Sequence, residues 1–252
     1  MTVSKQTYEP LQVKSLKEEF IDRFEHLILS GEFEIGRKLP PERELARQLK
    51  VSRPVIHEGL LELASRGLVS IVPRKGTYIN DYRSEGSLEL LVSLVNYHEG
   101  RIDRKILSSI LAMRVLFESE TAYLAAQHRS KEDLTALEEI LKEESVCTPG
   151  VPETVALVDY SFHHRIALAS GNMIYPLLMN SFRVLYLDIL GQFYRDPSVI
   201  DPIFQMHRDI VESIRQKNGE ASRNGMRTLL TFSENNLYRI LGMEKETHEI
   251  RT

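Results

Sequence analysis

The sequence is poor in cysteine and in long apolar runs. Cys147 is the single cysteine among 252 residues, which excludes an internal disulfide framework and suits a reducing compartment. No stretch approaches the ~20 consecutive apolar residues needed to cross a bilayer, and the opening segment MTVSKQTYEP lacks the apolar core of a secretion signal. We therefore expect a cytoplasmic protein with no membrane partner.

Several catalytic motifs are also missing. The sequence has no Gly-x-Ser-x-Gly elbow, no phosphate-binding glycine loop and no zinc-protease His-Glu-x-x-His motif. We therefore do not expect an enzyme. A metal-dependent helical enzyme and an acyl-CoA-binding protein remain open as alternatives. The enzyme would draw its acid–base groups from Asp159, His163, Asn172 or His207.

Composition is that of an ordinary globular protein, with 42% hydrophobic and 27% charged residues. The chain is long enough for two domains, each with its own core. The net charge of -4 is unevenly spread, because residues 1–80 carry 13 basic and 11 acidic side chains and residues 81–252 carry 19 and 25. Residues 37–75 hold nine basic side chains against four acidic ones. This local excess suits contacts with phosphate.

The first 80 residues show the order helix, helix, helix, hairpin. Apolar residues recur at helical spacing, the second helix is entered through Pro41, and Ser52 is a suitable N-cap for the third. β-branched and apolar residues flank a basic turn at 73–76, which predicts a hairpin. The predicted helices cover 16–30, 42–49 and 53–66, and the predicted strands cover 68–72 and 77–80. This order indicates a winged helix-turn-helix domain over residues 1–80.

In a helix-turn-helix, the first residues of the second helix meet base edges in the major groove. Arg53 is the candidate base reader here, because its guanidinium can bond to O6 and N7 of guanine together. We expect Ser52 and Arg43 to bind phosphate and the hairpin tip to reach the flanking backbone or the minor groove. The DNA-binding candidates are Arg43, Ser52, Arg53, Pro54, His57, Arg74 and Lys75.

Residues 81–87 are polar and contain Gly86, so we expect a linker there. The remainder has no β-rich run, and its periodic apolar segments are separated by glycine, proline and serine. The predicted helices cover 88–98, 104–128, 131–146, 151–170, 173–195, 198–217 and 220–241. We therefore predict a mainly α protein whose second domain, residues 88–245, is an all-helical bundle.

Five spaced motifs occur in the N-terminal domain: LPPERELA at 39–46, VSRP at 51–54, LLEL at 60–63, GL at 67–68 and KGT at 75–77. Together they resemble the GntR family of bacterial transcription regulators. The resemblance implies that Arg43, Arg53 and the hairpin tip contact operator DNA. His57 stands where the family usually has an arginine. A histidine cannot form arginine's bidentate guanine contact, so we expect a different operator half-site.

Further motifs occur in the helical part, including Met113-Arg114, VDY at 158–160, ASGN at 169–172 and LY at 185–186. They resemble the effector domain of the FadR subgroup of this family. The resemblance implies a bundle that holds a small effector, and a homodimer that spaces two recognition helices for a palindromic operator.

Many members of this subgroup bind a divalent metal through an Asp-x-x-x-His pair and two later histidines. Asp159 and His163 match the pair and share one helical face, and His207 matches the next ligand. Leu229 falls at the fourth position and cannot ligate. The resemblance therefore implies a three-ligand site for Zn, Ni or Mn, and a metal-free polar pocket is the alternative.

The nature of the effector stays open at this point. A small carboxylic acid resting on a metal and an acyl-CoA in an apolar channel both fit the subgroup. The effector-binding candidates are Arg114, Asp159, His163, Tyr186 and His207. We expect effector binding in the bundle to modulate the affinity for DNA.

Overall fold

The computed structural model describes residues 14–87, 90, 104–147 and 150–243. The chain divides into two compact units, Met1–Gly100 and Arg101–Thr252. The predicted helix 88–98 lies outside the described residues apart from position 90. Among the described residues, no helix is both long and apolar enough to span a membrane.

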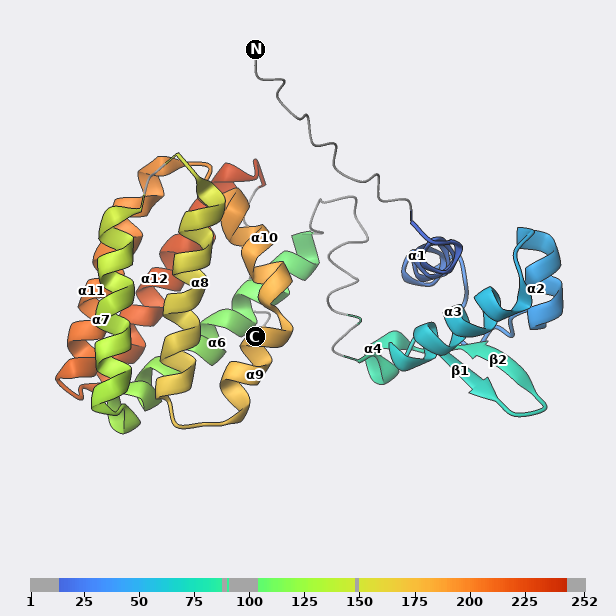
Figure 1. The fold of residues 1–252 in the computed structure, drawn as a ribbon, viewed down its shortest axis with the longest axis horizontal. Helices are drawn as coiled ribbons and strands as arrows, with labels where there is room; N and C mark the ends of the chain where they lie inside the picture. The colour runs from blue at the N-terminus through green and yellow to red at the C-terminus, as the bar shows by residue number, and fades with distance from the viewer. Residues whose placement is uncertain (1–13, 88–89, 91–103, 148–149, 244–252) are drawn as a thin grey trace, which may run out of the picture. The chain divides into compact units, whose positions relative to one another are not determined.

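The N-terminal unit is a winged helix domain (Figure 1). Helix α1 begins with a capping box, in which the Ser15 side chain accepts from the Glu18 backbone and Glu18 accepts from the Ser15 backbone. Pro41 is the extended residue immediately before α2, and Ser52 is the N-cap position of α3. The elements are α1 Leu16–Leu29, α2 Glu42–Leu49, α3 Arg53–Ser65, β1 Val69–Val72 and β2 Gly76–Ile79.

The wing is an antiparallel hairpin with Val69 opposite Ile79 and Val72 opposite Gly76. Its strands begin one residue later and one residue earlier, respectively, than the periodicity predicts. A bridge from Lys38 to Tyr78 extends the pairing beyond the hairpin. In the turn, Arg74 adopts a left-handed φ of 62°. This conformation turns the chain sharply at the basic tip.

The core of this unit gathers apolar side chains from α1, α3 and the wing, and Leu90 belongs to the same core. The segment predicted to be a linker contains helix α4 Tyr82–Glu85, whose N-cap is Asp81. The Ser87 backbone donates to the Arg66 carbonyl, 3.0 Å away. Residues 81–87 are therefore packed on the winged helix domain.

The C-terminal unit is a bundle of α-helices, as predicted (Figure 1). Its elements are α6 Arg104–His128, α7 Lys131–Val146, α8 Pro152–Ala169, α9 Ile174–Ser181, α10 Arg183–Phe193, the 3-10 turn η1 Pro197–Val199, α11 Ile200–Arg215 and α12 Gly219–Ile240. Helix α8 packs against α6, α7 and α10, while α12 packs against α6 and α11. This arrangement places the middle of α8 inside the bundle.

The prediction of a single helix over 173–195 is wrong. The backbone leaves the helical region at Phe182, with φ -98° and ψ 4°, and this break separates α9 from α10. Apolar periodicity continues across a one-residue break, so the sequence pattern does not reveal it. The helix predicted over 198–217 likewise opens with a 3-10 turn before α11 begins at Ile200.

Candidate functional site

The DNA-binding candidates all lie on the exposed surface of the winged helix domain. Arg43 is on α2, Arg53, Pro54 and His57 are on the first turns of α3, and Ser52 is the residue before it. The Ser52 side chain makes no capping bond within its own helix. The other two candidates, Arg74 and Lys75, form the wing turn between β1 and β2.

Glu42, at the start of α2, faces two of these residues. Its Oε1 lies 2.8 Å from Nδ1 of His57, and its Oε2 lies 4.0 Å from Nη2 of Arg53. The Arg53 and His57 side chains remain 65% and 54% exposed, so both can meet a partner. The structure thus brings together an acid and the two candidate base readers from adjacent helices.

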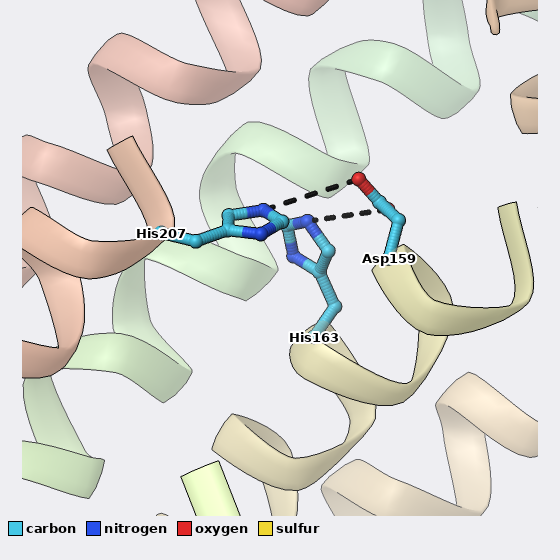
Figure 2. Close-up of side chains that lie close together, drawn as sticks. All are labelled: Asp159, His163 and His207. Atoms are coloured by element: carbon cyan, nitrogen blue, oxygen red, sulfur yellow. Dashed lines mark ion pairs between the residues drawn. The ribbon is translucent and has the colours of Figure 1, made fainter. Parts of the chain in front are cut away.

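The interior of the bundle brings Asp159, His163 and His207 together (Figure 2). Asp159 and His163 are one turn apart on α8, and His207 comes from α11. One ligand atom of each lies within 4.8 Å of the others. Nε2 of His163 is 3.6 Å from Oδ1 of Asp159, and Nε2 of His207 is 3.9 Å from Oδ2. All three side chains are buried.

A second carboxylate contacts the other ring nitrogen, Nδ1, of each histidine. Nδ1 of His163 lies 2.5 Å from Oε2 of Glu118, and Nδ1 of His207 lies 2.5 Å from Oε1 of Glu144. A carboxylate only accepts hydrogen bonds, so Nδ1 of His207 carries the hydrogen of its bond to Glu144, whereas the contact of His163 with Glu118 is an ion pair. In the neutral His207 ring, the lone pair is then on Nε2, the atom that faces Asp159. Histidine ligands of metals are oriented by carboxylates in the same way.

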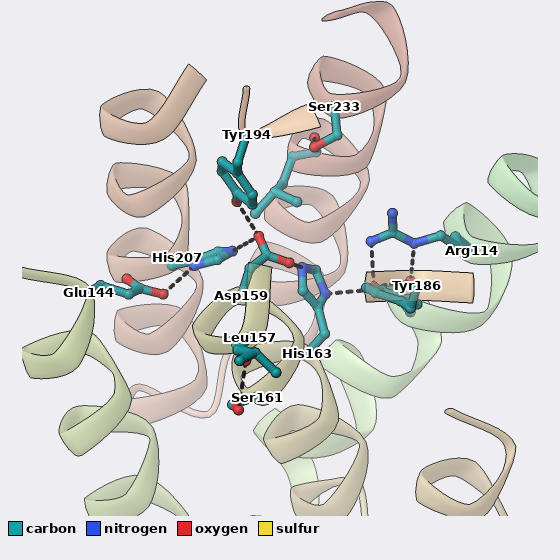
Figure 3. Close-up of polar contacts among 12 residues, drawn as sticks. Arg114, Glu144, Leu157, Asp159, Ser161, His163, Tyr186, Tyr194, His207 and Ser233 are labelled. Atoms are coloured by element: carbon teal, nitrogen blue, oxygen red, sulfur yellow. Dashed lines mark hydrogen bonds and ion pairs between the residues drawn. The ribbon is translucent and has the colours of Figure 1, made fainter. Parts of the chain in front are cut away.

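Glu118 also joins the cluster to Arg114 and Tyr186, two side chains that lie next to each other in Figure 3. The Arg114 Nε donates to Glu118 Oε1 over 2.6 Å, and the Tyr186 hydroxyl donates to the same carboxylate over 2.8 Å. Burial opposes ionisation of Glu118, but Arg114 and His163 outweigh it and lower its pKa to about 2. Glu118 is therefore a carboxylate held by a buried guanidinium.

Asp159 is held from the other side by Tyr194. The Tyr194 hydroxyl donates a short hydrogen bond to Asp159 Oδ2. Burial and the neighbouring Asp159 carboxylate raise the pKa of Tyr194 well above its ordinary value, so the hydroxyl stays a donor. This bond leaves Asp159 Oδ1 free of hydrogen bonds in the buried cluster.

A small pocket with a cavity volume of about 50 Å³ adjoins this network between α6, α9 and α10. Its polar lining is Arg114, Glu118 and Tyr186. The apolar lining is Ile110, Met113, Phe117, Leu178, Met179, Phe182, Leu185 and Ile189. Arg114 and Tyr186 therefore lie at this pocket, while Asp159, His163 and His207 lie beyond Glu118, deeper in the bundle.

The cluster fits a divalent metal with three protein ligands. Oδ1 of Asp159, Nε2 of His163 and Nε2 of His207 are buried and make no hydrogen bond. Three buried polar atoms without hydrogen bonds that face one another are costly unless a cation or protons join them. Leu229, the residue at the expected fourth position, is buried on α12 and offers no ligand atom.

Sequence reasoning missed Glu118, Glu144 and Tyr194 as members of this network. Glu118 carries a local signal, since it lies one helical turn after Arg114 and their side chains can meet. Glu144 and Tyr194 come from α7 and from the residue after α10. No spacing in the sequence links either of them to α8.

Two family descriptions match this chain. Residues 16–79 match the "Bacterial regulatory proteins, gntR family", and residues 109–232 match the "FCD domain". These matches coincide with the winged helix domain and with most of the helical bundle. FCD domains often bind a metal, which agrees with the cluster on α8 and α11.

The chain is also similar to curated regulators along most of its length. It is 26% identical over 233 residues to the HTH-type transcriptional regulator Mce2R of Mycobacterium tuberculosis, covering 92% of this chain and 96% of that protein. It is 28% identical over 170 residues to the fatty acid metabolism regulator protein of Pectobacterium atrosepticum, covering 68% and 69%.

A solved structure shares the fold. The structure of Lar, described as controlling the Listeria monocytogenes agr system, has a TM-score of 0.59 and 17% identity, covering 91% of this chain and 99% of Lar. The relatives are transcription regulators and not enzymes, so the enzyme alternative falls away. By these matches, the chain carries a winged helix domain of the gntR family of bacterial regulatory proteins followed by an FCD domain, and its relatives are GntR-type regulators.

Proposed function

We propose that this regulator binds a palindromic operator as a homodimer and that a ligand in its FCD domain changes its affinity for DNA. The exposed start of α3 carries the proposal, because Arg53 and His57 are exposed there and the wing of the same domain carries the exposed basic residues Arg74 and Lys75. One recognition helix covers only a few base pairs, so two copies are needed for a specific site. Footprinting of the promoter should show two half-sites, and a single unrepeated half-site at saturation would contradict the dimer.

Each DNA-binding residue has a distinct role in this proposal. Arg53 reads a guanine through O6 and N7, and Pro54 fixes the first turn of α3 beside it. Ser52 and Arg43 bind phosphate, the former through a hydroxyl that its own helix leaves uncapped. Arg74 and Lys75 contact the flanking backbone or the minor groove.

We propose that Asp159, His163 and His207 hold a divalent ion such as Zn²⁺, Ni²⁺ or Mn²⁺. The supporting observation is the composition of the buried network, in which the carboxylates of Asp159, Glu118 and Glu144 share the interior with one guanidinium, that of Arg114. Unless the imidazoles are protonated, two negative charges stay uncompensated in the interior, which is costly. A divalent ion would balance them, and three protein ligands would leave open positions for oxygen ligands.

The pocket beside this network supports an effector with an acidic head and an apolar body. Arg114 and Tyr186 line one side of it, where both already bond to Glu118 and where an acidic head could take the place of that carboxylate, and the exposed lining is almost wholly apolar. A small carboxylic acid uses the polar end and the cluster beyond it. An acyl-CoA is the second candidate, because the apolar lining of α6, α9 and α10 suits an acyl chain.

Calorimetry separates these possibilities. Wild type should bind Zn²⁺, Ni²⁺ or Mn²⁺, whereas His163→Ala and His207→Ala should abolish binding. His164→Ala is the matched control, because His164 is the next residue on α8 and stacks on Tyr160 outside the cluster. Acyl-CoA binding that neither cluster substitution affects, together with no metal uptake, would remove all three residues from the site.

A further inference from the structure

Glu42 and His57 form a hydrogen-bonded pair that links α2 and α3 of the winged helix domain. They come from α2 and α3, and Glu42 Oε1 lies 2.8 Å from His57 Nδ1. His57 follows Arg53 by one helical turn, so the two side chains share a face of α3. Glu42 lies close to both, which makes it the group that can orient the His57 ring.

This contact fixes the chemistry of the exposed end of the ring. A carboxylate has no hydrogen to give, so Nδ1 of His57 must donate to Glu42. The neutral ring then has no hydrogen on Nε2, which becomes an acceptor. The ring is 54% exposed, so Nε2 can accept a hydrogen bond from outside the protein.

Base edges in the major groove differ in what they offer to an acceptor. Cytosine presents the N4 amine and adenine the N6 amine, both donors, whereas guanine presents only the acceptors N7 and O6. An acceptor on His57 therefore suits an exocyclic amine and disfavours guanine. An arginine at this position would have the opposite preference, because it carries only donors.

We propose that His57, oriented by Glu42, reads an exocyclic amine of cytosine or adenine in each operator half-site. This inference rests on the proposed docking of α3 in the major groove. Glu42 is a positioning residue in this arrangement, and His57 determines the specificity at one base pair. The neighbouring Arg53 supplies the donors for a guanine. Arg53 and His57 together therefore read a guanine and a base that carries an exocyclic amine.

The test is selection of bound sequences from a randomised operator library with the full-length protein. The position that His57→Ala relaxes identifies the base concerned. Wild type should prefer cytosine or adenine there by about fivefold or more, and His57→Arg should change the preference to guanine. Glu42→Gln should reduce the preference to less than about twofold, because an amide fixes neither ring nitrogen as the donor.

Glu44→Gln is the matched control, since it removes the same charge from α2 but affects only contacts within that helix, with Arg47 at 2.6 Å and Gln48 at 2.7 Å. It should leave the selected base unchanged. A wild-type preference for guanine, or selection that His57→Ala leaves intact, would overturn this inference alone. Binding without any sequence selectivity would overturn the proposed function and this inference with it.

Discussion

The buried pair of Arg114 and Glu118 should dominate the stability of the helical bundle. Its side chains are 6% and 2% exposed, and their closest atoms are 2.6 Å apart. Glu118→Gln keeps the volume of the side chain and can still accept from Tyr186. It removes the charge that compensates Arg114 in the interior. The free energy of unfolding should therefore fall sharply.

Two routes give the magnitude. Removal of one partner from a buried ion pair costs about 3–5 kcal/mol, because the other charge is left uncompensated. The pKa of Glu118, about 2 against its ordinary 4.5, corresponds to ~3 kcal/mol at 1.36 kcal/mol per unit. Both routes place the loss near ~3 kcal/mol or above, which is a large share of the stability of an ordinary domain.

Urea unfolding followed by far-ultraviolet circular dichroism measures this loss, since the sequence contains no tryptophan to report by fluorescence. Glu138→Gln is the control, because it breaks a 3.0 Å pair with Arg215 whose side chains are 45% and 40% exposed. It should cost less than ~0.5 kcal/mol. Replacement of both partners, Arg114→Met with Glu118→Leu, should recover part of the loss. The prediction would fail if the free energy of unfolding of Glu118→Gln lay within ~1 kcal/mol of the wild-type value and its slope against urea concentration were unchanged.

Three further outcomes are expected, for DNA binding, for stability at low pH and for the effect of a ligand. Arg53→Ala should lose ~1–3 kcal/mol of operator binding and relax the preference at one base pair, whereas Lys75→Ala should weaken all sequences alike and lower the salt slope by about one; full sequence discrimination by Arg53→Ala in a competition assay would reject the assigned recognition helix. Because the pKa of Glu118 is lowered, its stabilisation is complete above pH 4.5 and is lost as the pH falls towards about 2; acid unfolding of Glu118→Gln should lack this component, and identical pH profiles would contradict it. An effector that weakens DNA binding must itself bind more weakly to the operator-bound protein by the same factor, which titration with and without operator measures; equal affinities would eliminate the coupling.

The helices of the bundle were largely predictable because their ends carry local signals. The sequence predicts α6 and α7 with the bounds that the structure shows, and Ser130 caps α7 through the box that it forms with Asp133. The pair of Asp159 and His163 was predictable for the same reason, since a spacing of four residues places both on one face of a helix.

Contacts between separate helices were not predictable in this way. Glu144 and His207 are hydrogen-bonded although they lie 63 residues apart in the chain, and the hydrogen-bonded pair of Tyr194 and Asp159 is 35 residues apart. Their presence depends on how the helices pack, which periodicity within one helix does not encode. The pairing of Lys38 with Tyr78 is likewise a tertiary contact. The predicted residues therefore form the inner part of the cluster, and the structure supplies the carboxylates and hydroxyls around it.

The close approach at Gly67 bears on where the DNA-binding part could be separated by genetic engineering. Gly67 has a φ of 77°, and a Cβ there would lie 1.8 Å from the Glu85 carbonyl oxygen, so only glycine lets α4 rest against the end of α3. Leu90 is 3% exposed within the same core. An autonomously folding fragment should therefore extend past residue 90. A fragment that stopped at residue 80 would lack α4 and Leu90 and would expose the core residues that they cover to water.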